Sequence, residues 1–302
     1  MKINNERLYV YTFYRFIKLK NTQKIKNKLD TFFLKTKLRG TILLSTEGIN
    51  ASISGSRKEI KDCMKLVRKI LKIRKLGIKI NSVQYNPFNK LKVRQKKEIV
   101  SLGKGYFDVN KNTGIFISPS EWDELIISND LKLIDTRNIY EIEIGKFKNA
   151  INPMTHNFRE FPSKFKSLKI HKNHKIAMYC TGGIRCEKAS AYLKTKGYKH
   201  IFQLDGGIIN YIKHHERKKR NELWNGECFV FDNRVTINSN LEKGKYVQCY
   251  GCRRPLSKKD LRSKFYIKGV SCGFCYHERT EQQKRSSMTR QIQIEKGRDF
   301  ET

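Results

Sequence analysis

The sequence predicts a multidomain chain of mixed α/β and α+β class. Its 302 residues exceed what one domain of roughly 100 to 200 residues holds. Near Ser118 the pattern changes from short strands and amphipathic helices to a regular alternation of helix and strand, and beyond residue 220 it changes to short apolar runs with paired cysteines. We therefore expect domains at residues 1–95, 118–220 and 221–302, with a basic linker at 96–117.

The first domain is predicted to be ferredoxin-like, with elements in the order β-α-β-β-α-β. Residues 9–16 alternate in the manner of a strand, and Ile25, Leu29 and Phe33 recur at helical spacing. Ser56 is suited to cap the second helix. The inward face of that helix is expected to carry Ile60, Met64, Val67, Ile70 and Leu71. The expected strands are residues 9–16, 41–45, 51–54 and 78–85, and the first helix is residues 22–36.

The chain is strongly basic, and the excess is concentrated near its start. Sixty-four Lys and Arg residues against 28 Asp and Glu residues give a net charge of +36, and residues 1–100 alone hold 26 basic and 6 acidic residues. Such a charge attracts polyanions, among which nucleic acid is the obvious partner. A genome rich in A and T would also raise the lysine content, so a merely solvated basic face is the alternative.

A basic segment follows the first domain. In residues 91–100 (LKVRQKKEIV), alternation puts Lys92, Arg94 and Lys96 on one side of an extended chain. There they and Lys97 are predicted to bind RNA phosphates. A solvated linker is the alternative.

Residues 118–220 are predicted to form a parallel sheet with helical crossovers. Ser118 and Pro119 open a helix that runs to Ile127, and a second helix is expected at residues 185–196. Short buried strands are expected at residues 131–135, 175–179 and 201–204. Chemistry in such sheets gathers beyond the carboxyl ends of the strands, which is where Asp135, Cys180 and Asp205 fall.

The strongest chemical signal is a cysteine loop between a buried strand and a helix, with the sequence Cys180-Thr181-Gly182-Gly183-Ile184-Arg185-Cys186. Backbone N–H groups and the helix N-terminus are expected to stabilise a thiolate at Cys180. Gly182 and Gly183 permit the tight loop, and Arg185 is expected to add a positive charge near its rim. Cys186 is predicted either to pack in the first helical turn or to resolve an oxidised Cys180 by forming a disulfide. A buried structural cysteine is the alternative for position 180.

The length of this loop separates two chemistries. Four residues lie between Cys180 and Arg185, whereas cysteine phosphatases have five there to surround a phosphate. The smaller ring suits a sulfur atom carried on cysteine. The strand, loop and helix resemble the rhodanese domain, and the resemblance extends to residues 133–137 and 204–207. On that likeness Cys180 is the nucleophile that forms a persulfide. We place Arg185 and Asp135 with it in the catalytic group, because of the charge of Arg185 and the position of Asp135 after a strand.

Four longer motifs resemble the rhodanese-containing tRNA uridine-34 hydroxylase family and follow that family's order. They are residues 40–50 (GTILLSTEGIN), 92–100 (KVRQKKEIV), 135–141 (DTRNIYE) and 180–190 (CTGGIRCEKAS). The resemblance covers about residues 5–280. It implies an acylphosphatase-like (ferredoxin-like) N-terminal domain, a central rhodanese domain and a cysteine-containing C-terminal segment.

The resemblance also implies an oxidoreductase that converts wobble uridine 34 of certain tRNAs to 5-hydroxyuridine, with molecular oxygen as co-substrate. The anticodon loop of tRNA is then the implied partner, and no DNA partner is expected. A single-stranded base can be splayed out and stacked on an aromatic ring. Phe88 and Tyr106 are candidate rings, with core packing as the alternative for each.

The sequence does not identify how oxygen is activated or which molecule donates electrons. It contains no Gly-rich dinucleotide fingerprint and no His and carboxylate pattern for non-haem iron. We interpret His214-His215-Glu216 as the polar end of a helix. We expect Cys180 to supply covalent chemistry, either by adding to C6 of uracil to activate C5 or by carrying an oxidised sulfur.

The C-terminal segment contains two further cysteine pairs, Cys249-Tyr-Gly-Cys252 and Cys272-Gly-Phe-Cys275, with nineteen residues between them. Two such knuckles can supply four thiolates to a structural zinc ion in a zinc-ribbon-like fold, and His277 is an alternative ligand. Reduced cysteines or a redox pair are the alternatives to zinc. The polar tail from Thr280 onward is expected to be disordered or a loose helix.

Two other functions remain open from the sequence, a rhodanese-type sulfurtransferase that acts through a Cys180 persulfide and a non-catalytic RNA-binding protein. Six of the eight cysteines lie in close pairs, which favours thiol and metal chemistry in a reducing compartment over disulfides. The sequence has no apolar run of about 20 residues and no apolar signal region. We therefore expect a cytoplasmic protein without a membrane partner.

Overall fold

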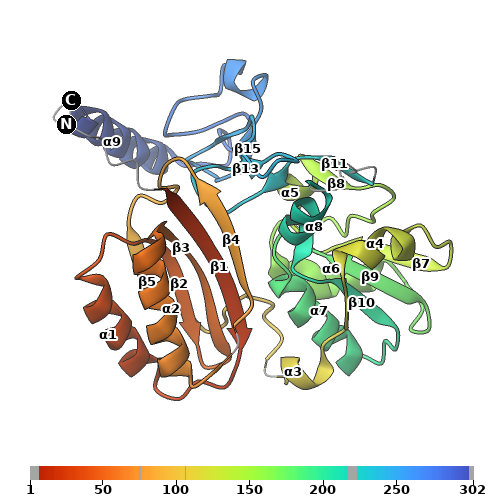
Figure 1. Ribbon diagram of the computed structural model, residues 1–302. Helices are drawn as coiled ribbons and strands as arrows, with labels where there is room; N and C mark the ends of the chain where they lie inside the picture. The colour runs from red at the N-terminus through yellow and green to blue at the C-terminus, as the bar shows by residue number, and fades with distance from the viewer. Residues whose placement is uncertain (1–6, 75, 106, 217–222, 299–302) are drawn as a thin grey trace.

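The computed structural model describes residues 7–74, 76–105, 107–216 and 223–298. Within these ranges the chain forms an N-terminal sheet with two helices, a central parallel sheet with helices around it, and a C-terminal segment that ends in a long helix (Figure 1). In the part described, no helix is both long and apolar enough to cross a bilayer. Tyr106, a candidate stacking ring, lies outside the described residues.

The N-terminal domain has the predicted ferredoxin-like order of elements. Its sheet has the strand order β4-β1-β3-β2-β5, in which β1 to β4 pair in antiparallel fashion. Ser56 accepts a hydrogen bond from the backbone N–H of Glu59 and caps the second helix as expected. The elements are β1 (Leu8–Phe16), α1 (Thr22–Phe33), β2 (Arg39–Ser45), β3 (Gly48–Ser56), α2 (Arg57–Leu71), β4 (Ile78–Val83) and β5 (Leu91–Gln95).

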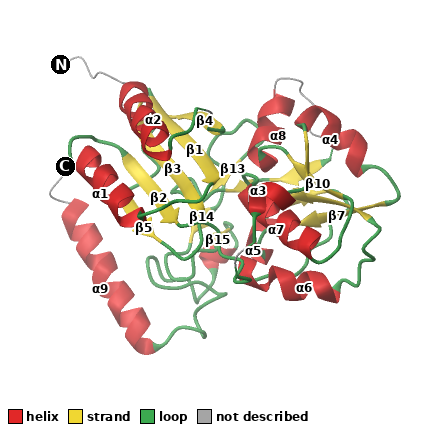
Figure 2. Cartoon of the chain, turned by 90° about the horizontal axis from the view of Figure 1, so that it is seen from below, coloured by secondary structure: helices red, strands yellow, loops and turns green. Residues whose placement is uncertain are grey.

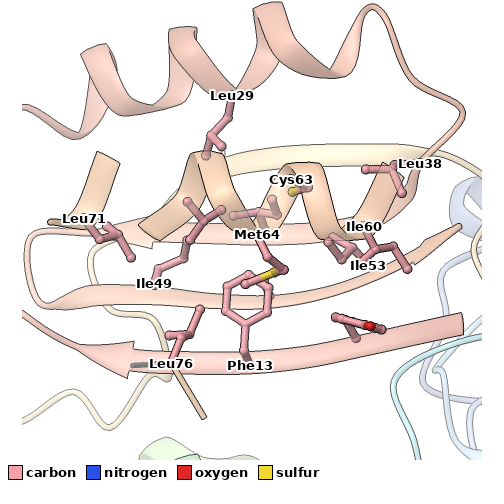
Figure 3. Packing of buried hydrophobic residues seen from close by; sticks show 14 of the residues in the cluster. Phe13, Leu29, Leu38, Ile49, Ile53, Ile60, Cys63, Met64, Leu71 and Leu76 are labelled. Atoms are coloured by element: carbon pink, nitrogen blue, oxygen red, sulfur yellow. The ribbon is translucent and has the colours of Figure 1, made fainter. Parts of the chain in front are cut away.

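One face of this sheet is covered by α1 and α2, and the buried side chains between them form a single cluster (Figure 3). Phe13 and Ile49 of the strands meet Ile60 and Met64 of α2, the face that helical spacing predicts. Cys63 lies on the same face of α2, and burial raises the pKa of its thiol to about 12. Cys63 is therefore a packing residue of this core.

The opposite face of the sheet packs on the central domain. Tyr14 and Phe16 of β1 join Ile99, Val109 and Ala191 in a second cluster. Because successive side chains of a strand point to opposite faces, β1 contributes to both clusters. The N-terminal domain is thus held against the helix that follows the Cys180 loop.

β5 is a strand rather than a solvated linker. It pairs in parallel with β2 and adds a fifth strand to the edge of the sheet. Leu91 and Val93 pack against the core, whereas Lys92 and Arg94 are exposed. The alternation of residues 91–95 therefore reflects a half-buried edge strand.

The central domain is the predicted parallel sheet, with the strand order β6-β10-β9-β7. β6 (Ile115–Ile117) lies inside the segment 96–117 that the sequence assigns to a linker, so this domain begins before residue 118. Its other strands and helices are β7 (Leu131–Asp135), β9 (Lys175–Tyr179), β10 (Ile201–Leu204), α3 (Val109–Asn112), α4 (Pro119–Ile126), α5 (Ile139–Ile142), α6 (Phe161–Ser167), α7 (Ile184–Thr195), α8 (Gly207–Glu216) and a 3-10 turn (Phe158–Glu160).

The beginning of the expected C-terminal segment belongs to the core of the central domain. β11 (Trp224–Gly226) pairs with β8 (Gly145–Phe147), and Trp224, Cys228 and Ile237 lie in the same cluster as the sheet residues. The sequence prediction ended this domain at residue 220 because these apolar residues occur in short runs with no regular period. They fill the core without forming a long element.

The rest of the C-terminal segment surrounds the cysteine pairs and ends in α9 (Glu281–Arg298), so the polar tail is helical over the described residues. Figure 2 shows α9 projecting along one side of the molecule. The remaining short elements are β12 (Cys228–Phe229), β13 (Thr236–Ile237), β14 (Val247–Gln248), β15 (Pro255–Leu256) and a 3-10 turn (Asp260–Arg262).

Candidate active site at the Cys180 loop

Cys180 stands where the sequence predicts it, directly after β9 and before α7. Its side chain is buried, and its Sγ accepts a hydrogen bond from the backbone N–H of Gly183 at 3.0 Å. Gly183 has a φ of 98°, a left-handed conformation that favours glycine. The loop thus turns its amides inward around the sulfur.

The surroundings of Cys180 stabilise its thiolate. Burial alone raises the pKa of a thiol. The pKa of Cys180 is nevertheless well below its ordinary value, because the thiolate accepts hydrogen bonds from the Cys186 thiol and from the backbone N–H groups of Cys186 and Gly182. The charge of Arg185 lowers the pKa further. A thiolate is the form of cysteine that acts as a nucleophile. Cys180 therefore has the properties of a reactive residue.

Arg185 is buried, with an exposed fraction of 6%, so it does not lie at the rim as predicted. Its guanidinium forms a two-bond ion pair with Glu141, with N–O distances of 2.5 and 2.8 Å, and also donates to Thr181 Oγ1 at 3.2 Å. The Glu141 carboxylate is fully enclosed, and the sequence prediction did not select it. Its position at N3 of the α5 capping box was the available signal. Glu141 fixes Arg185, and Arg185 fixes the loop.

Asp135 does not join this group, and the structure argues against its predicted catalytic role. Its carboxylate is fully buried and is occupied by Arg137, which donates through Nε at 3.0 Å and through Nη2 at 2.7 Å. Arg137 in turn donates to the backbone carbonyls of Glu141 and Gly145. The pair ties β7 to the following turn, because a buried carboxylate needs a charged partner.

Cys186 lies in the first turn of α7, is fully buried and is a free thiol. Its Sγ is 3.4 Å from Thr136 Oγ1. Burial and the neighbouring Cys180 raise its pKa well above the ordinary value, so Cys186 stays protonated beside the Cys180 thiolate. This favours the packing and hydrogen-bonding role for Cys186 in the reduced protein.

The N-terminal domain supplies one wall of the loop. The Lys79 side chain on β4 donates a hydrogen bond to the carbonyl of Gly182, and Tyr14 on β1 donates to Glu187 Oε2 at 2.9 Å. A Cβ atom added at Gly183 would lie 3.0 Å from Tyr14 Oη. Gly183 thus also makes room for the neighbouring domain. No sequence motif points to Lys79 or Tyr14, because they meet the loop across 103 and 173 residues.

A buried ion cluster joins the two domains next to this wall. Lys188 of α7 donates to both carboxylate oxygens of Glu47, to Glu98 Oε2 at 2.6 Å and to the carbonyl of Val100. Its exposed fraction is 1%. Glu47, Glu98 and Lys188 come from three of the four motifs quoted above. Those motifs therefore meet at the domain interface.

The predicted RNA-binding residues, Lys92, Arg94, Lys96 and Lys97, are all exposed along and just after β5. Slight desolvation and the nearby charges of Arg94, Lys90 and Arg253 lower the pKa of Lys92, so Arg253 of the C-terminal segment lies near this stripe. β5 and β4 form opposite edges of the five-stranded sheet. The basic stripe, which consists of Lys92, Arg94, Lys96 and Lys97, is therefore four strand spacings, or about 19 Å, from β4, the strand that carries Lys79.

One exposed aromatic ring lies beside the loop. Phe231 has an exposed fraction of 64%, and the Arg185 guanidinium carbon is 5.7 Å from the centre of its ring. The sequence prediction did not select Phe231. Of the rings that it did select, Phe88 is half-buried.

The four C-terminal cysteines come together as predicted. The sulfur atoms of Cys249, Cys252, Cys272 and Cys275 all lie within 4.8 Å of one another. Three of their separations are 3.8, 3.8 and 3.9 Å. A tetrahedron with metal–sulfur bonds of about 2.3 Å has edges of about 3.8 Å, so the donor set fits a zinc ion. His277 packs against Phe265 and Tyr276 and is outside the set.

His215 is also a packing residue. Its ring stacks on Tyr211 with centroids 4.0 Å apart, and its Nε2 lies 2.9 Å from Asp123 Oδ2. α8 ends at Glu216. His214, His215 and Glu216 thus lie in the last described turn of α8.

Comparison with known proteins gives matches to both domains. Residues 8–99 match the UPF0176 acylphosphatase like domain, and residues 118–214 match the rhodanese-like domain. The chain is 45% identical over 286 residues to the tRNA uridine(34) hydroxylase of Pelagibacter ubique (strain HTCC1062), which covers 94% of this chain and 93% of that protein.

Two solved structures each match about a third of the chain. A rhodanese-related protein from Thermoplasma volcanium is 26% identical, covers 33% of this chain and 92% of its own, and has a TM-score of 0.29. A rhodanese-like domain protein from Staphylococcus aureus is 24% identical, covers 32% of this chain and 90% of its own, and has a TM-score of 0.28.

Proposed function

The chain belongs to the tRNA uridine(34) hydroxylase family, and we propose that it converts the wobble uridine of tRNA to 5-hydroxyuridine at Cys180. The observation that carries this proposal is the buried Cys180 thiol, whose pKa is held well below the ordinary value inside a ring of amides. Such a thiolate has no use in packing, because its burial costs free energy. It supports a covalent role.

The chemistry that suits this thiolate is addition to the pyrimidine ring. The sulfur of Cys180 forms a bond to C6, the C5–C6 double bond opens, and electron density moves to C5 and O4. C5 then reacts with an oxygen electrophile, and loss of the C5 proton and of the thiolate restores the double bond. With molecular oxygen, one atom enters the product and the other leaves as water, so the reaction takes two electrons and two protons from a reductant.

The other residues of the loop act by positioning. Glu141 and Arg185 hold the loop through their ion pair, and Thr181 receives a hydrogen bond from the same guanidinium. The N-terminal domain adds Lys79, whose ammonium group lies against the Gly182 carbonyl. Positive charge next to the loop favours the thiolate over the thiol.

The substrate is an anticodon loop held by phosphate contacts and base stacking. The exposed stripe of Lys92, Arg94, Lys96 and Lys97 is suited to the backbone of the tRNA. Phe231 is suited to stack on the splayed base, because its ring is exposed and adjoins Arg185. Cytoplasm is the compartment that fits a tRNA substrate and eight free cysteines.

The four C-terminal cysteines are assigned to a structural zinc ion. All four positions of a tetrahedral site would be filled by protein sulfur, which leaves no open position for catalysis. The ion would fix the segment that carries Arg253 next to the basic stripe. Its contribution is therefore to folding and RNA binding.

The test is mass spectrometry of tRNA nucleosides from cells that lack wobble-uridine modification, supplied with the intact gene or with Cys180→Ser. We expect a uridine one oxygen atom heavier at position 34 with the intact gene only, and growth in heavy-oxygen gas should label it. Replacement of oxygen by sulfur gives nearly the same shift, and accurate mass separates the two. Thiolated uridine would instead make the protein a sulfurtransferase, and unmodified uridine in both strains would contradict any catalytic role.

A further inference from the structure

A cavity of about 820 Å³ lies between the two domains, along the free edge of β4. In Figures 1 and 2, β4 is the strand of the N-terminal sheet that faces α8. The wall opposite β4 consists of Lys213 and Glu216 on α8 and of residues 240–243. No role assigned so far uses this cavity.

Three segments connect the cavity with the Cys180 loop. β4 carries Lys79 at the loop and continues along the cavity from Ile80. α8 begins at the loop, where the Ile208 backbone N–H donates to the carbonyl of Cys180 at 2.9 Å. Lys213 in the cavity wall lies six residues beyond Gly207, which is about 9 Å along the axis of this helix. The third segment runs from Phe231, which adjoins Arg185, to Arg234 in the cavity wall.

The lining is suited to a phosphate chain. It includes four cationic side chains, those of Arg7, Lys213, Arg234 and Lys243, against two exposed carboxylates, those of Glu216 and Glu242. Arg234 is 94% buried and is paired with Asp232, yet its Nη1 has no hydrogen-bond partner among the described residues. An unsatisfied donor costs free energy, and a phosphate oxygen that reached Nη1 would satisfy it.

The lining also offers recognition of a base. Tyr85 has an exposed fraction of 43%, and Lys243 Nζ is 5.8 Å from the centre of its ring. Amide side chains that can bind the edges of bases stand around it, from Asn81, Gln84 and Asn240. A ring next to a cation is the combination that holds single-stranded nucleotides by stacking and charge.

The basic stripe on β5 does not reach this position. It lies at the opposite edge of the sheet, about 19 Å from β4. Nucleotides next to the reacting base therefore need a second set of contacts nearer to Cys180. The cavity has the position, the charge and the aromatic ring that such contacts require.

We propose that this cavity binds the single-stranded anticodon-loop nucleotides that flank the base presented to Cys180, with one base stacked on Tyr85 and phosphates held by Lys243, Lys213 and Arg234. This assignment rests on the proposed function, because it identifies where the tRNA substrate of that reaction is held. The stripe on β5 then binds the tRNA body, and the cavity sets which nucleotide reaches the thiolate.

The test measures binding of a fluorescent anticodon stem-loop RNA to the full chain carrying Cys180→Ser, with and without Tyr85→Ala or Lys243→Met. We expect Tyr85→Ala to weaken binding roughly tenfold and Tyr85→Phe to restore it, because stacking needs the ring and not the hydroxyl. Lys243→Met should reduce the salt dependence of binding by about one phosphate contact. Phe116→Ala and Lys65→Met are the matched controls, since both side chains are exposed and lie outside the cavity lining.

A second measurement locates the RNA directly. Stem-loops with 5-iodouridine at position 33 or 35 are irradiated with the protein, and the cross-linked peptide is sequenced. We expect a cross-link to the peptide that contains Tyr85. Cross-links confined to the β5 stripe would overturn the assignment, and so would equal binding of the stem-loop by Tyr85→Ala and by the protein with Tyr85. Free nucleotides that bind the cavity as tightly as the stem-loop RNA and displace it would also overturn it. Binding and cross-linking need no turnover. If RNA binds in the cavity but no 5-hydroxyuridine forms in the nucleoside assay, the proposed function is refuted and the assignment of the cavity stands.

Discussion

The two cysteine sites of this protein both contain thiols at short spacing, but they are assembled from different distances along the chain. All four sulfurs of the C-terminal cluster come from residues 249–275, and each pair sits in its own tight turn. Cys180 depends on Glu141, Lys79 and Tyr14, which lie on other elements and partly in another domain. A metal site can therefore be read from local spacing, whereas a reactive thiolate depends on the tertiary fold.

The largest effect that tests this comparison is loss of the metal from the cluster. Cys252→Ser should lower the zinc content from one ion per chain to about none, because three thiolates and a hydroxyl bind zinc far more weakly. Apparent binding free energies of structural zinc sites are about 10 to 16 kcal/mol at neutral pH, and that stabilisation of the segment would be lost. Metal analysis and amide hydrogen exchange across residues 245–280 measure it.

The same variant checks that the two sites are separate. Alkylation of Cys180 at neutral pH should proceed at the wild-type rate, since none of its contacts comes from the cluster. Purified wild-type protein that is free of metal and melts at the same temperature would contradict the assignment of zinc.

The second largest effect is expected at the reactive thiol itself. Cys180→Ser should reduce hydroxylation at least about ten-thousandfold, because a serine hydroxyl is not ionised near neutral pH and cannot replace the thiolate. Its zinc content should equal that of wild type. Single-turnover assays with tRNA measure the rate, and appreciable hydroxylation by the serine variant would exclude covalent chemistry at this position.

The contrast between the sites also explains what the sequence could predict. The order of strands and helices follows from periodicity and capping, as at Ser56 and Ser118, and the cysteine loop follows from its position between a buried strand and a helix. The C-terminal cysteine cluster follows from the spacing of its two pairs alone. Each of these inferences uses residues that are close in the sequence.

The parts that the sequence could not predict involve distant or irregular segments. Asp135 follows a strand as a catalytic carboxylate would, but Arg137 neutralises it, and only the fold shows that pair to be buried. Trp224 and Cys228 enter the central core from short runs without a period. Phe231 and Lys79 reach the loop from segments whose own sequences carry no catalytic motif.

The ion cluster between the domains should give the third effect. Lys188→Met removes the cation that Glu47 and Glu98 share and leaves two carboxylates facing each other, which should lower the free energy of unfolding by about 3 kcal/mol. Lys65→Met, which breaks an exposed pair with Asp62, should change it by less than about 0.5 kcal/mol. Urea unfolding followed by fluorescence compares the two.

This prediction also extends the comparison. The ion cluster of Glu47, Glu98 and Lys188 supports the wall next to Cys180 and is separate from the four C-terminal cysteines. Cys180 should be alkylated more slowly in Lys188→Met, while the zinc content stays at one ion per chain. An equal loss of stability in Lys65→Met would mean that net charge, and not the buried cluster, accounts for the effect.

The smallest effect isolates the contribution of the N-terminal domain to the thiolate. Burial lowers the pKa of Lys79, and the attraction between its amine and the Cys180 thiolate opposes that shift, so the pKa of Cys180 should rise in Lys79→Met. The thiolate is the form that reacts, and it is lost as the pH falls through the pKa. The midpoint of the alkylation rate against pH should therefore move to higher pH in the variant. Iodoacetamide labelling over a pH series measures this midpoint.

A merely structural role for Lys79 would lower the maximal labelling rate or the stability without moving the midpoint. Lys79→Arg keeps the positive charge and should hold the midpoint near the wild-type value, whereas Lys65→Met changes the same net charge far from the loop and should leave it unchanged. If Lys79→Met and wild type had the same midpoint, the Cys186 thiol, the loop amides and Arg185 would account for the low pKa without Lys79. Cys180 would then be as independent of the other domain as the C-terminal cysteine cluster is.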